Sequence, residues 1–245
     1  MTRLEKKIIS EIDHANDIWQ LFSEGERVLL GISGGKDSIA LYHLLQNYQL
    51  KLEALHIRLS SRFSIDFITQ NNLTDKLEVI ETDIYDQIKK SDNSLNTCFV
   101  CSRERRKRIL EYANDKGIKK IVFGHHRNDV VETLLLNLLF SREISTLLPK
   151  QTLFEGRFEI IRPLYLVEEQ LLISLQKEKG WQISKPVCEE SISSKRQYMR
   201  DLLTQIQDQH PKIDIRDNIF SSLKSVKTSF MPFPFIEQGG GRDEE

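Results

Sequence analysis

Hydrophobic positions along the chain follow two spacings, which predict where helices and strands lie. Near the start, apolar residues recur every three or four positions, as in an amphipathic helix: Leu4, Ile8, Ile12, Ala15, Trp19 and Phe22. Short apolar runs predict buried strands at residues 27–32, 52–57, 77–81, 120–123 and 156–162. Helical spacing returns at residues 39–47, 168–179, 194–209 and 217–227. Strands and helices therefore alternate through most of the chain.

This alternation predicts an α/β fold. Strands joined by helical crossovers form a parallel sheet with helices on both faces, and the helices near the two ends of the chain would be additions to it. We expect an amphipathic helix within residues 1–24, one α/β domain at 25–228 and a flexible tail at 229–245, which ends in glycines and charged residues. A chain of 245 residues is long enough to bury such a core without disulfides.

Composition indicates a soluble protein. Hydrophobic residues make up 39% of the chain and charged residues 29%, an ordinary balance. The first residues are charged and lack the apolar segment of a signal peptide. The longest apolar runs, such as residues 134–140, are too short to span a bilayer. We therefore expect a cytoplasmic protein with no membrane partner.

The net charge of −1 conceals a basic stretch. Between Cys98 and Lys120, eight lysines and arginines stand against three acidic residues. Such an excess is suited to a polyanionic partner, although a solvated helix face is an equally good interpretation of charge alone. The candidate contacts with a polyanion include Arg103, Arg105, Arg106 and Arg108.

The segment Ser33-Gly34-Gly35-Lys36-Asp37-Ser38 lies where a predicted strand gives way to a helix. Its two glycines let backbone N–H groups converge on phosphate oxygens, and the start of the helix points its positive dipole end at the same anion. Lys36, which we expect to be exposed, adds a full positive charge. Asp37 is better suited to Mg²⁺ carried by the phosphates. Neither the Walker A spacing nor the dinucleotide-binding G-x-G-x-x-G spacing fits this segment.

A second polar turn, Gly124-His125-His126-Arg127-Asn128-Asp129, follows the predicted strand at residues 120–123 and opens a helix that carries Glu132. Open α/β sheets bind ligands at the carboxyl ends of their strands, where this turn lies. Paired histidines alone are more often capping or core residues than catalysts. A neighbouring phosphate loop favours a role in ligand binding.

The three cysteines of the chain, Cys98, Cys101 and Cys188, permit several interpretations. A zinc site would need a fourth ligand such as histidine. A redox dithiol is also possible, because the start of a helix and nearby cations lower the pKa of a thiol. Three thiolates can instead hold an iron–sulfur cluster with one iron left open, and that iron can bind a sulfide. Three unrelated buried thiols are the remaining alternative.

Residues 33–38 resemble the SGGxDS signature of the PP-loop, or N-type ATP pyrophosphatase, superfamily. The segment from Gly124 to Thr133 is similar to the G-H-x-x-D-D-x-x-E-T motif of the same group, with Asn128 in place of one acid. The resemblance implies an adenine-nucleotide alpha-hydrolase-like (HUP/PP-loop) fold. It also implies an ATP site formed by residues 33–38 with Gly124, His125 and His126, in which Lys36, Asp37 and Asp129 have catalytic roles and Asp37 holds Mg²⁺.

Further motifs resemble the tRNA-cytidine 2-sulfurtransferase family, over residues 27–227: Thr97-Cys98-Phe99-Val100-Cys101-Ser102-Arg103, Gly124-His125-His126-Arg127, Ile161-Arg162-Pro163-Leu164, and Cys188 eight residues before Arg196. The resemblance implies that ATP adenylates O2 of an anticodon-loop cytidine. Sulfur from a [4Fe-4S] cluster held by Cys98, Cys101 and Cys188 then gives 2-thiocytidine and AMP. The implied partners are tRNA, bound by the basic stretch, and a sulfur donor, either a cysteine desulfurase or sulfide. A homodimer is left open.

Two departures from the family's pattern bear on the target base. Residues 56–61 lack the acidic residue usual after the second strand, and Lys185 stands where many members have another cysteine. A lysidine synthetase-like ligase would not need the cysteines, and a zinc-finger-bearing 2-thiouridine synthetase would need more of them. A non-enzymatic RNA-binding protein would have no need for Lys36, Asp37 and the paired histidines.

Overall fold

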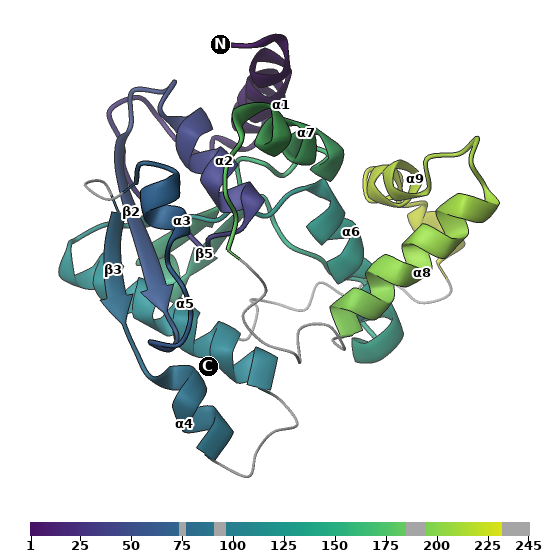
Figure 1. Cartoon of the computed structure of the whole chain (residues 1–245). Helices are drawn as coiled ribbons and strands as arrows, with labels where there is room; N and C mark the ends of the chain where they lie inside the picture. The colour runs from purple at the N-terminus through teal and green to yellow at the C-terminus, as the bar shows by residue number, and fades with distance from the viewer. Residues whose placement is uncertain (74–76, 91–96, 185–194, 232–245) are drawn as a thin grey trace.

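The computed structural model describes residues 1–73, 77–90, 97–184 and 195–231, apart from the side chain of Cys98. Within these residues the chain forms a six-stranded sheet in the order β3-β2-β1-β4-β6-β5 (Figure 1). Each neighbouring pair is parallel except β5 and β6, which are antiparallel. The strands are β1 (Arg27–Gly31), β2 (Lys51–Arg58), β3 (Leu77–Glu81), β4 (Lys120–Val122), β5 (Lys150–Leu153) and β6 (Phe158–Ile161).

Helices cover both faces of the sheet. They are α1 (Arg3–Trp19), α2 (Lys36–Leu45), α3 (Phe67–Gln70), α4 (Ile84–Lys90), α5 (Thr97–Asp115), α6 (Arg127–Leu136), α7 (Glu169–Lys179), α8 (Lys195–Gln209) and α9 (Ile215–Ser222), with short turns η2 (Asn137–Ser141), η3 (Phe154–Gly156) and η5 (Thr228–Phe230). Val28 and Leu30 of β1 pack in one core with α1, α2, α6 and α7. Leu29 packs in a second core with α4 and α5. Because successive strand residues point to opposite faces, the two cores lie on opposite sides of the sheet, as the sequence predicted.

The first helix forms for reasons that are local to its sequence. The Thr2 N–H donates to the Glu5 carboxylate at 2.6 Å, and the Glu5 N–H donates to the Thr2 hydroxyl at 3.2 Å, which makes a capping box. Ile8, Ile12 and Ala15 are fully buried. The helix ends at Trp19, within the range predicted for it, and Gln20 follows in the left-handed conformation with φ of 50°.

The predicted parallel sheet is confirmed for five strands, and the structure adds a sixth. Predicted strands at residues 27–32, 52–57, 77–81, 120–123 and 156–162 correspond to β1, β2, β3, β4 and β6. Strand β5 was not predicted, because its four residues are mostly polar and only half-buried. It reaches β6 through η3 as an antiparallel hairpin at the edge of the sheet.

Two predicted helices have different bounds in the structure. Helix α2 begins at Lys36 rather than residue 39, because Gly35 is its extended N-cap (φ −80°, ψ 160°). The last long helix covers residues 215–222 rather than 217–227. It begins early because the Asp214 carboxylate accepts a hydrogen bond from the Asp217 N–H at 2.8 Å. Helix α2 therefore starts inside the predicted phosphate loop.

Most of the predicted tail lies outside the described residues. No helix in the described part of the chain is both long and apolar enough to cross a membrane. Helices α8 and α9 pack against α6 and against each other (Figure 1). They are the C-terminal helical addition that the sequence predicted.

Candidate active site

The loop between β1 and α2 lies at the carboxyl edge of the sheet. Gly34 has a φ of +85°, and its carbonyl accepts a hydrogen bond from the Ser184 N–H at 2.8 Å. A Cβ added to Gly34 would lie 2.9 Å from Cε1 of Phe67 and 2.9 Å from Cβ of Ser184. Glycine is therefore required here both by its backbone angle and by its neighbours.

Hydroxyl groups close this loop on itself. The Ser38 hydroxyl donates to the Gly35 carbonyl at 3.0 Å and lies 3.1 Å from the Ser33 hydroxyl. The Gly35 N–H donates to the Ser33 hydroxyl at 3.2 Å, and the Ser33 N–H donates to the Ser38 hydroxyl at 3.2 Å. The two serines thus hold the loop in shape before α2 begins.

Lys36 is more enclosed than we expected from its place in a loop, with a side chain 19% exposed. Its ammonium donates to Glu169 Oε1 at 2.8 Å and lies 3.2 Å from the Asp37 carboxylate. Burial alone would lower the pKa of Lys36, but Asp37 and Glu169 outweigh it and raise that pKa above its ordinary value. Glu169, at the start of α7, thus joins the site. Sequence reasoning missed it because nothing near residue 169 indicates a partner 133 positions away.

Gly124 brings the two predicted motifs into contact. A Cβ added to Gly124 would lie 3.2 Å from the carbonyl carbon of Asp37 and 3.2 Å from the backbone nitrogen of Ser38. The turn after β4 therefore packs directly against the start of α2. Strands β1 and β4 are neighbours in the sheet, which sets the two turns side by side.

His126 lies at the centre of this arrangement and is 1% exposed. Its backbone N–H donates to the Asp129 carboxylate at 3.0 Å. Its ring nitrogen Nε2 lies 3.4 Å from Asp129, 3.8 Å from Asp37 and 4.0 Å from Glu169. Burial raises the pKa of Asp37, although His126 and Lys36 oppose that shift. Burial disfavours the charged form of Asp129 too, but His126, with its backbone N–H, and Arg196 oppose burial and the pKa of Asp129 is lowered.

His125 has a different environment from its neighbour. Burial lowers the pKa of His125 to about 4, so its imidazole is neutral near pH 7. Its ring lies edge-on to Phe123, with centroids 5.8 Å apart. Its Nδ1 has no hydrogen-bond partner within the part of the chain that the structure describes. That buried nitrogen is therefore an unsatisfied polar group of the site.

Two arginines of α8 reach the acidic residues of α6. The Arg200 Nε donates to Glu132 Oε1 at 2.7 Å, and Arg196 Nη1 lies 3.8 Å from Asp129 Oδ1. Glu132 is 1% exposed, and burial raises its pKa against the opposing effect of Arg200. Sequence reasoning did not include Arg196, Arg200 or Glu132 among the site residues. A spacing of four residues on one predicted helix was the available signal for the two arginines.

Helix α5 begins at the same edge of the sheet, where Val100 and Glu104 of its first turns line a cavity with the end of β3. Cys101 is 8% exposed and packs in the core beneath α5. The side chain of Cys98 and all of Cys188 lie outside the described residues. His56, near the end of β2, is buried, and its Nδ1 lies 2.7 Å from the Ile32 carbonyl oxygen. Burial and then the charge of Arg105 lower the pKa of His56.

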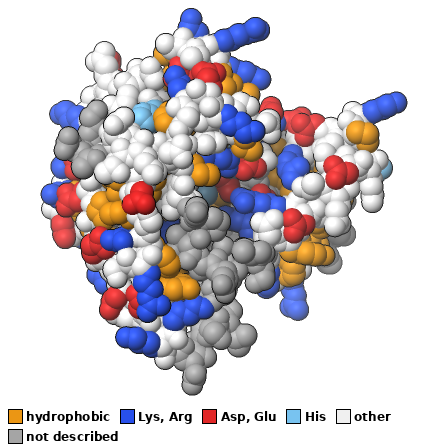
Figure 2. All heavy atoms as spheres, in the orientation of Figure 1, with side chains coloured by type: hydrophobic (Ala, Val, Ile, Leu, Met, Phe, Trp, Pro, Cys, Tyr) orange, Lys and Arg blue, Asp and Glu red, His pale blue; other side chains and the backbone are white. Residues whose placement is uncertain are grey.

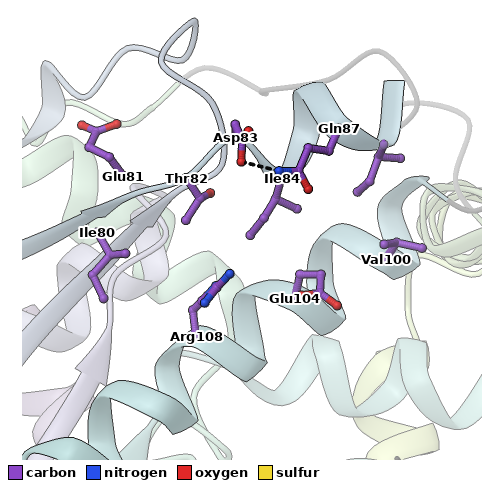
Figure 3. Close-up of a pocket in the computed structure, with 10 residues that line it drawn as sticks. Ile80, Glu81, Thr82, Asp83, Ile84, Gln87, Val100, Glu104 and Arg108 are labelled. Carbon is purple, nitrogen blue, oxygen red and sulfur yellow. Dashed lines mark hydrogen bonds between the residues drawn. The ribbon is translucent and has the colours of Figure 1, made fainter. Parts of the chain in front are cut away.

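The four arginines of the basic stretch do not share one face. Arg105 is half-buried toward the sheet, whereas Arg103 and Arg106 are exposed. Arg108 borders a cavity of about 460 Å³ at the end of β3, together with Glu104 and Asp83 (Figure 3). Lysine and arginine side chains also gather beside acidic ones in the hollow between α8 and the body of the molecule (Figure 2). In the described residues, no group of three or more His, Cys, Asp or Glu is placed to hold a metal.

The sheet order, the phosphate loop and the adjoining Gly–His–His turn define an ATP-binding enzyme of the PP-loop class. The PP-loop domain family matches residues 4–206 of the chain. A tRNA-cytidine(32) 2-sulfurtransferase of Shewanella pealeana is 32% identical over 241 residues, which cover 94% of this chain and 76% of that protein. One from Coxiella burnetii is 31% identical over 238 residues, which cover 93% and 92% of the two chains. The chain belongs to the PP-loop family and, within it, to the tRNA-cytidine 2-sulfurtransferases, as its motifs predicted.

A solved structure has the same fold at low sequence identity. The U34-tRNA thiolase NcsA from Methanococcus maripaludis, with its [4Fe-4S] cluster, superposes with a TM-score of 0.72. The two chains are 18% identical, and the match covers 91% of this chain and 78% of that one. This likeness confirms the predicted fold class.

Proposed function

We propose that the chain is an ATP-dependent tRNA thiolase that converts an anticodon-loop cytidine to 2-thiocytidine, at the position 32 named for its relatives. The observation that carries the proposal is the contact of Gly124 with the backbone of Asp37 and Ser38. That contact joins the phosphate loop to His126 and Asp129 in one site, and α5 with Cys101 begins at the same edge of the sheet.

The phosphate loop fits the triphosphate of ATP. Gly34 and Gly35 let an anion approach the backbone with no Cβ in the way, and α2 directs its positive dipole end at the same place. Lys36 lies at the start of that helix, held by Glu169. Ser33, Ser38 and the Gly124-His125-His126 turn complete the site.

Magnesium fits the acidic residues of this site. Asp37 Oδ1 is buried and accepts no hydrogen bond from the described residues, although the Lys36 ammonium lies near it. Mg²⁺ is commonly bound by one or two carboxylates together with substrate phosphates, so Asp37 would hold it, with Asp129 nearby. The ion would neutralise phosphate charge in a site that already contains four carboxylates: Asp37, Asp129, Glu132 and Glu169.

In the activation step, the cytosine O2 attacks the α-phosphorus of ATP. The bond between the α-phosphorus and its bridging oxygen to the β-phosphate breaks, and pyrophosphate leaves with that electron pair. Lys36 stabilises the charge on pyrophosphate, because it is a fixed cation in a partly enclosed site. Asp129 fixes the backbone of His126 at the start of α6 by accepting a hydrogen bond from its backbone N–H.

The cysteines would hold a [4Fe-4S] cluster, and Cys101 fits this role because it is buried beside the carboxyl edge. Cys98 and Cys188 are its proposed partners. When bound, the cluster supplies the sulfur that replaces the activated oxygen at C2, with AMP as the leaving group. Sulfide would restore that sulfur directly, and a cysteine desulfurase would do so together with a two-electron reductant. Arg103, Arg105, Arg106 and Arg108 are the proposed contacts to tRNA.

Nucleoside analysis tests this function. Chain purified without air is incubated with unmodified tRNA, ATP, Mg²⁺ and sulfide, and the digested tRNA is analysed by mass spectrometry. We expect 2-thiocytidine and bound iron, and we expect both to be lost in Cys98→Ser, Cys101→Ser and Cys188→Ser while ATP binding remains. Ser102→Ala is the matched control, since it changes an exposed neighbour of Cys101. The appearance of 2-thiouridine or lysidine, or normal thiolation by Cys188→Ser, would refute the proposal.

A further inference from the structure

Phe99 is an exposed aromatic residue between two of the cysteines. Its side chain is 66% exposed, and it belongs to neither hydrophobic core. Its neighbours Val100 and Cys101 both pack in the core beneath α5. Packing within the described part of the chain therefore does not account for a phenylalanine at this position.

Cations flank this ring on the outward face of α5. Arg103 and Arg106 follow Phe99 by four and seven positions, so the three side chains share one helical face. With a rise of about 1.5 Å per residue, Arg103 stands about 6 Å along the helix from Phe99 and Arg106 about 10 Å. The Arg103 side chain is 57% exposed, and its nearest acidic contact is the adjacent Glu104 at 3.6 Å. Phe99, Arg103 and Arg106 form what we call the outer stripe of α5.

The opposite side of α5 has a different chemistry. Val100, Glu104 and Arg108 line the cavity at the end of β3 (Figure 3). Arg108 also lies 3.1 Å from Glu111 on its own helix. The side facing the cavity thus carries its own acidic groups, whereas the outer stripe combines an open aromatic ring with two exposed arginines.

We propose that Phe99 is a stacking platform for an unpaired base of the tRNA loop, while Arg103 and Arg106 contact the flanking phosphates. This inference rests on the proposed function and names a substrate contact within it. Proteins read single-stranded RNA loops mainly by stacking splayed bases on aromatic rings, because every base has a flat π-face. A basic helix face beside the ring supplies the charge that the RNA backbone requires.

Phe99 is a positioning residue in this proposal. The cytidine must leave its stack before its O2 can meet ATP, and a base stacked on Phe99 would hold the loop open beside the thiols. The adjacency to Cys98 and Cys101 matters, because sulfur must reach C2 of the same cytidine. Stacking does not depend on ionic charge. Loss of the ring should therefore leave the salt dependence of tRNA binding unchanged, whereas loss of an arginine should reduce it.

Fluorescence anisotropy with a labelled anticodon stem-loop tests the proposal, using the full chain purified without air. We expect Phe99→Ala and Phe99→Leu to weaken binding roughly 5- to 100-fold, the range for one lost stacked base. Phe99→Trp should keep most of the affinity. The dependence of log K on log[salt] should keep its slope in all three, whereas Arg103→Gln with Arg106→Gln should reduce it by about 0.7 for each lost contact.

Phe154→Ala is the matched control. Phe154 is 50% exposed and lies between β5 and β6, at the amino ends of the parallel strands and so at the opposite edge of the sheet. We expect it to bind the stem-loop as the parent does. A stem-loop with 2-aminopurine next to the target cytidine gives a second readout, because its fluorescence should fall on binding to the parent and not to Phe99→Leu.

The outcomes separate this inference from the function on which it rests. If the parent binds no tRNA, the proposed function and the stacking role both fail. If the parent binds and thiolates tRNA but Phe99→Ala binds equally well, the stacking role alone fails. Slower thiolation by Phe99→Ala with unchanged tRNA affinity and an unchanged fall in 2-aminopurine fluorescence would give the ring a role other than stacking and would overturn the proposal.

Discussion

Replacing Gly34 by alanine tests the shape of the phosphate loop. Gly34 has a φ of +85°, a left-handed conformation that is unfavourable by about 1–2 kcal/mol for a residue with a Cβ. The new methyl group would also lie 2.9 Å from both Phe67 and Ser184, and overpacking of this kind costs about 1–3 kcal/mol. We therefore expect the free energy of unfolding to fall by about 2–5 kcal/mol.

Gly25→Ala separates the two contributions. Gly25 has a φ of +75° but nothing within 4 Å of an added Cβ, so only the backbone contribution of about 1–2 kcal/mol applies. Urea unfolding followed by circular dichroism measures both variants, and titration with a non-hydrolysable ATP analogue measures the loop. Gly34→Ala should be the less stable variant and should alone lose ATP affinity. Equal losses of stability would refute the argument from Phe67 and Ser184.

Two further predictions concern charge. Lys36→Ala should abolish ATP-dependent pyrophosphate release with the circular dichroism spectrum intact; release at the parent rate would contradict the assignment of the loop. His125 has a folded pKa of about 4 against about 6.5 unfolded, so the unfolded chain takes up the proton first as pH falls. The parent should lose about 1–2 kcal/mol of stability through this group between pH 7 and pH 5, after a discount for partial exposure. Urea titrations of His125→Asn should lack that part of the loss, and an unchanged pH dependence would contradict the pKa.

The phosphate loop could be predicted from sequence because its function depends on contiguous residues. Gly34, Gly35 and Lys36 act through local backbone geometry and one helix start, and the apolar run before them indicates a buried strand. The same holds for the turn at Gly124, which follows a second apolar run. The sequence alone could also suggest that the two turns meet, since the carboxyl ends of parallel strands share one edge.

The remaining site residues could not be predicted, because their partners are distant in sequence. Glu169 becomes part of the site only through Lys36, and Arg200 only through Glu132, 68 positions away. No local pattern marks Glu169, and the four-residue spacing of Arg196 and Arg200 on one helix does not say which residues they contact. The basic stretch was predicted as a unit, but the helical repeat of α5 turns Arg105 toward the sheet and leaves Arg103 and Arg106 outside. Such a division depends on which face of a helix the fold buries, and charge counts carry no information about it.

The order of strands in the sheet has a consequence for synthesis on the ribosome. Strand β1 emerges early, yet one of its two neighbours, β4, follows 89 residues behind it, and the edge of β1 stays unpaired until then. The Gly34 carbonyl can accept its hydrogen bond from the Ser184 N–H only later still. Lys36 likewise cannot pair with Glu169 until that residue has been synthesised. The nascent chain therefore cannot gain stability from cellular ATP until most of it has left the ribosome. We expect the first three strands to depend on their own helices, or on chaperones, during that interval.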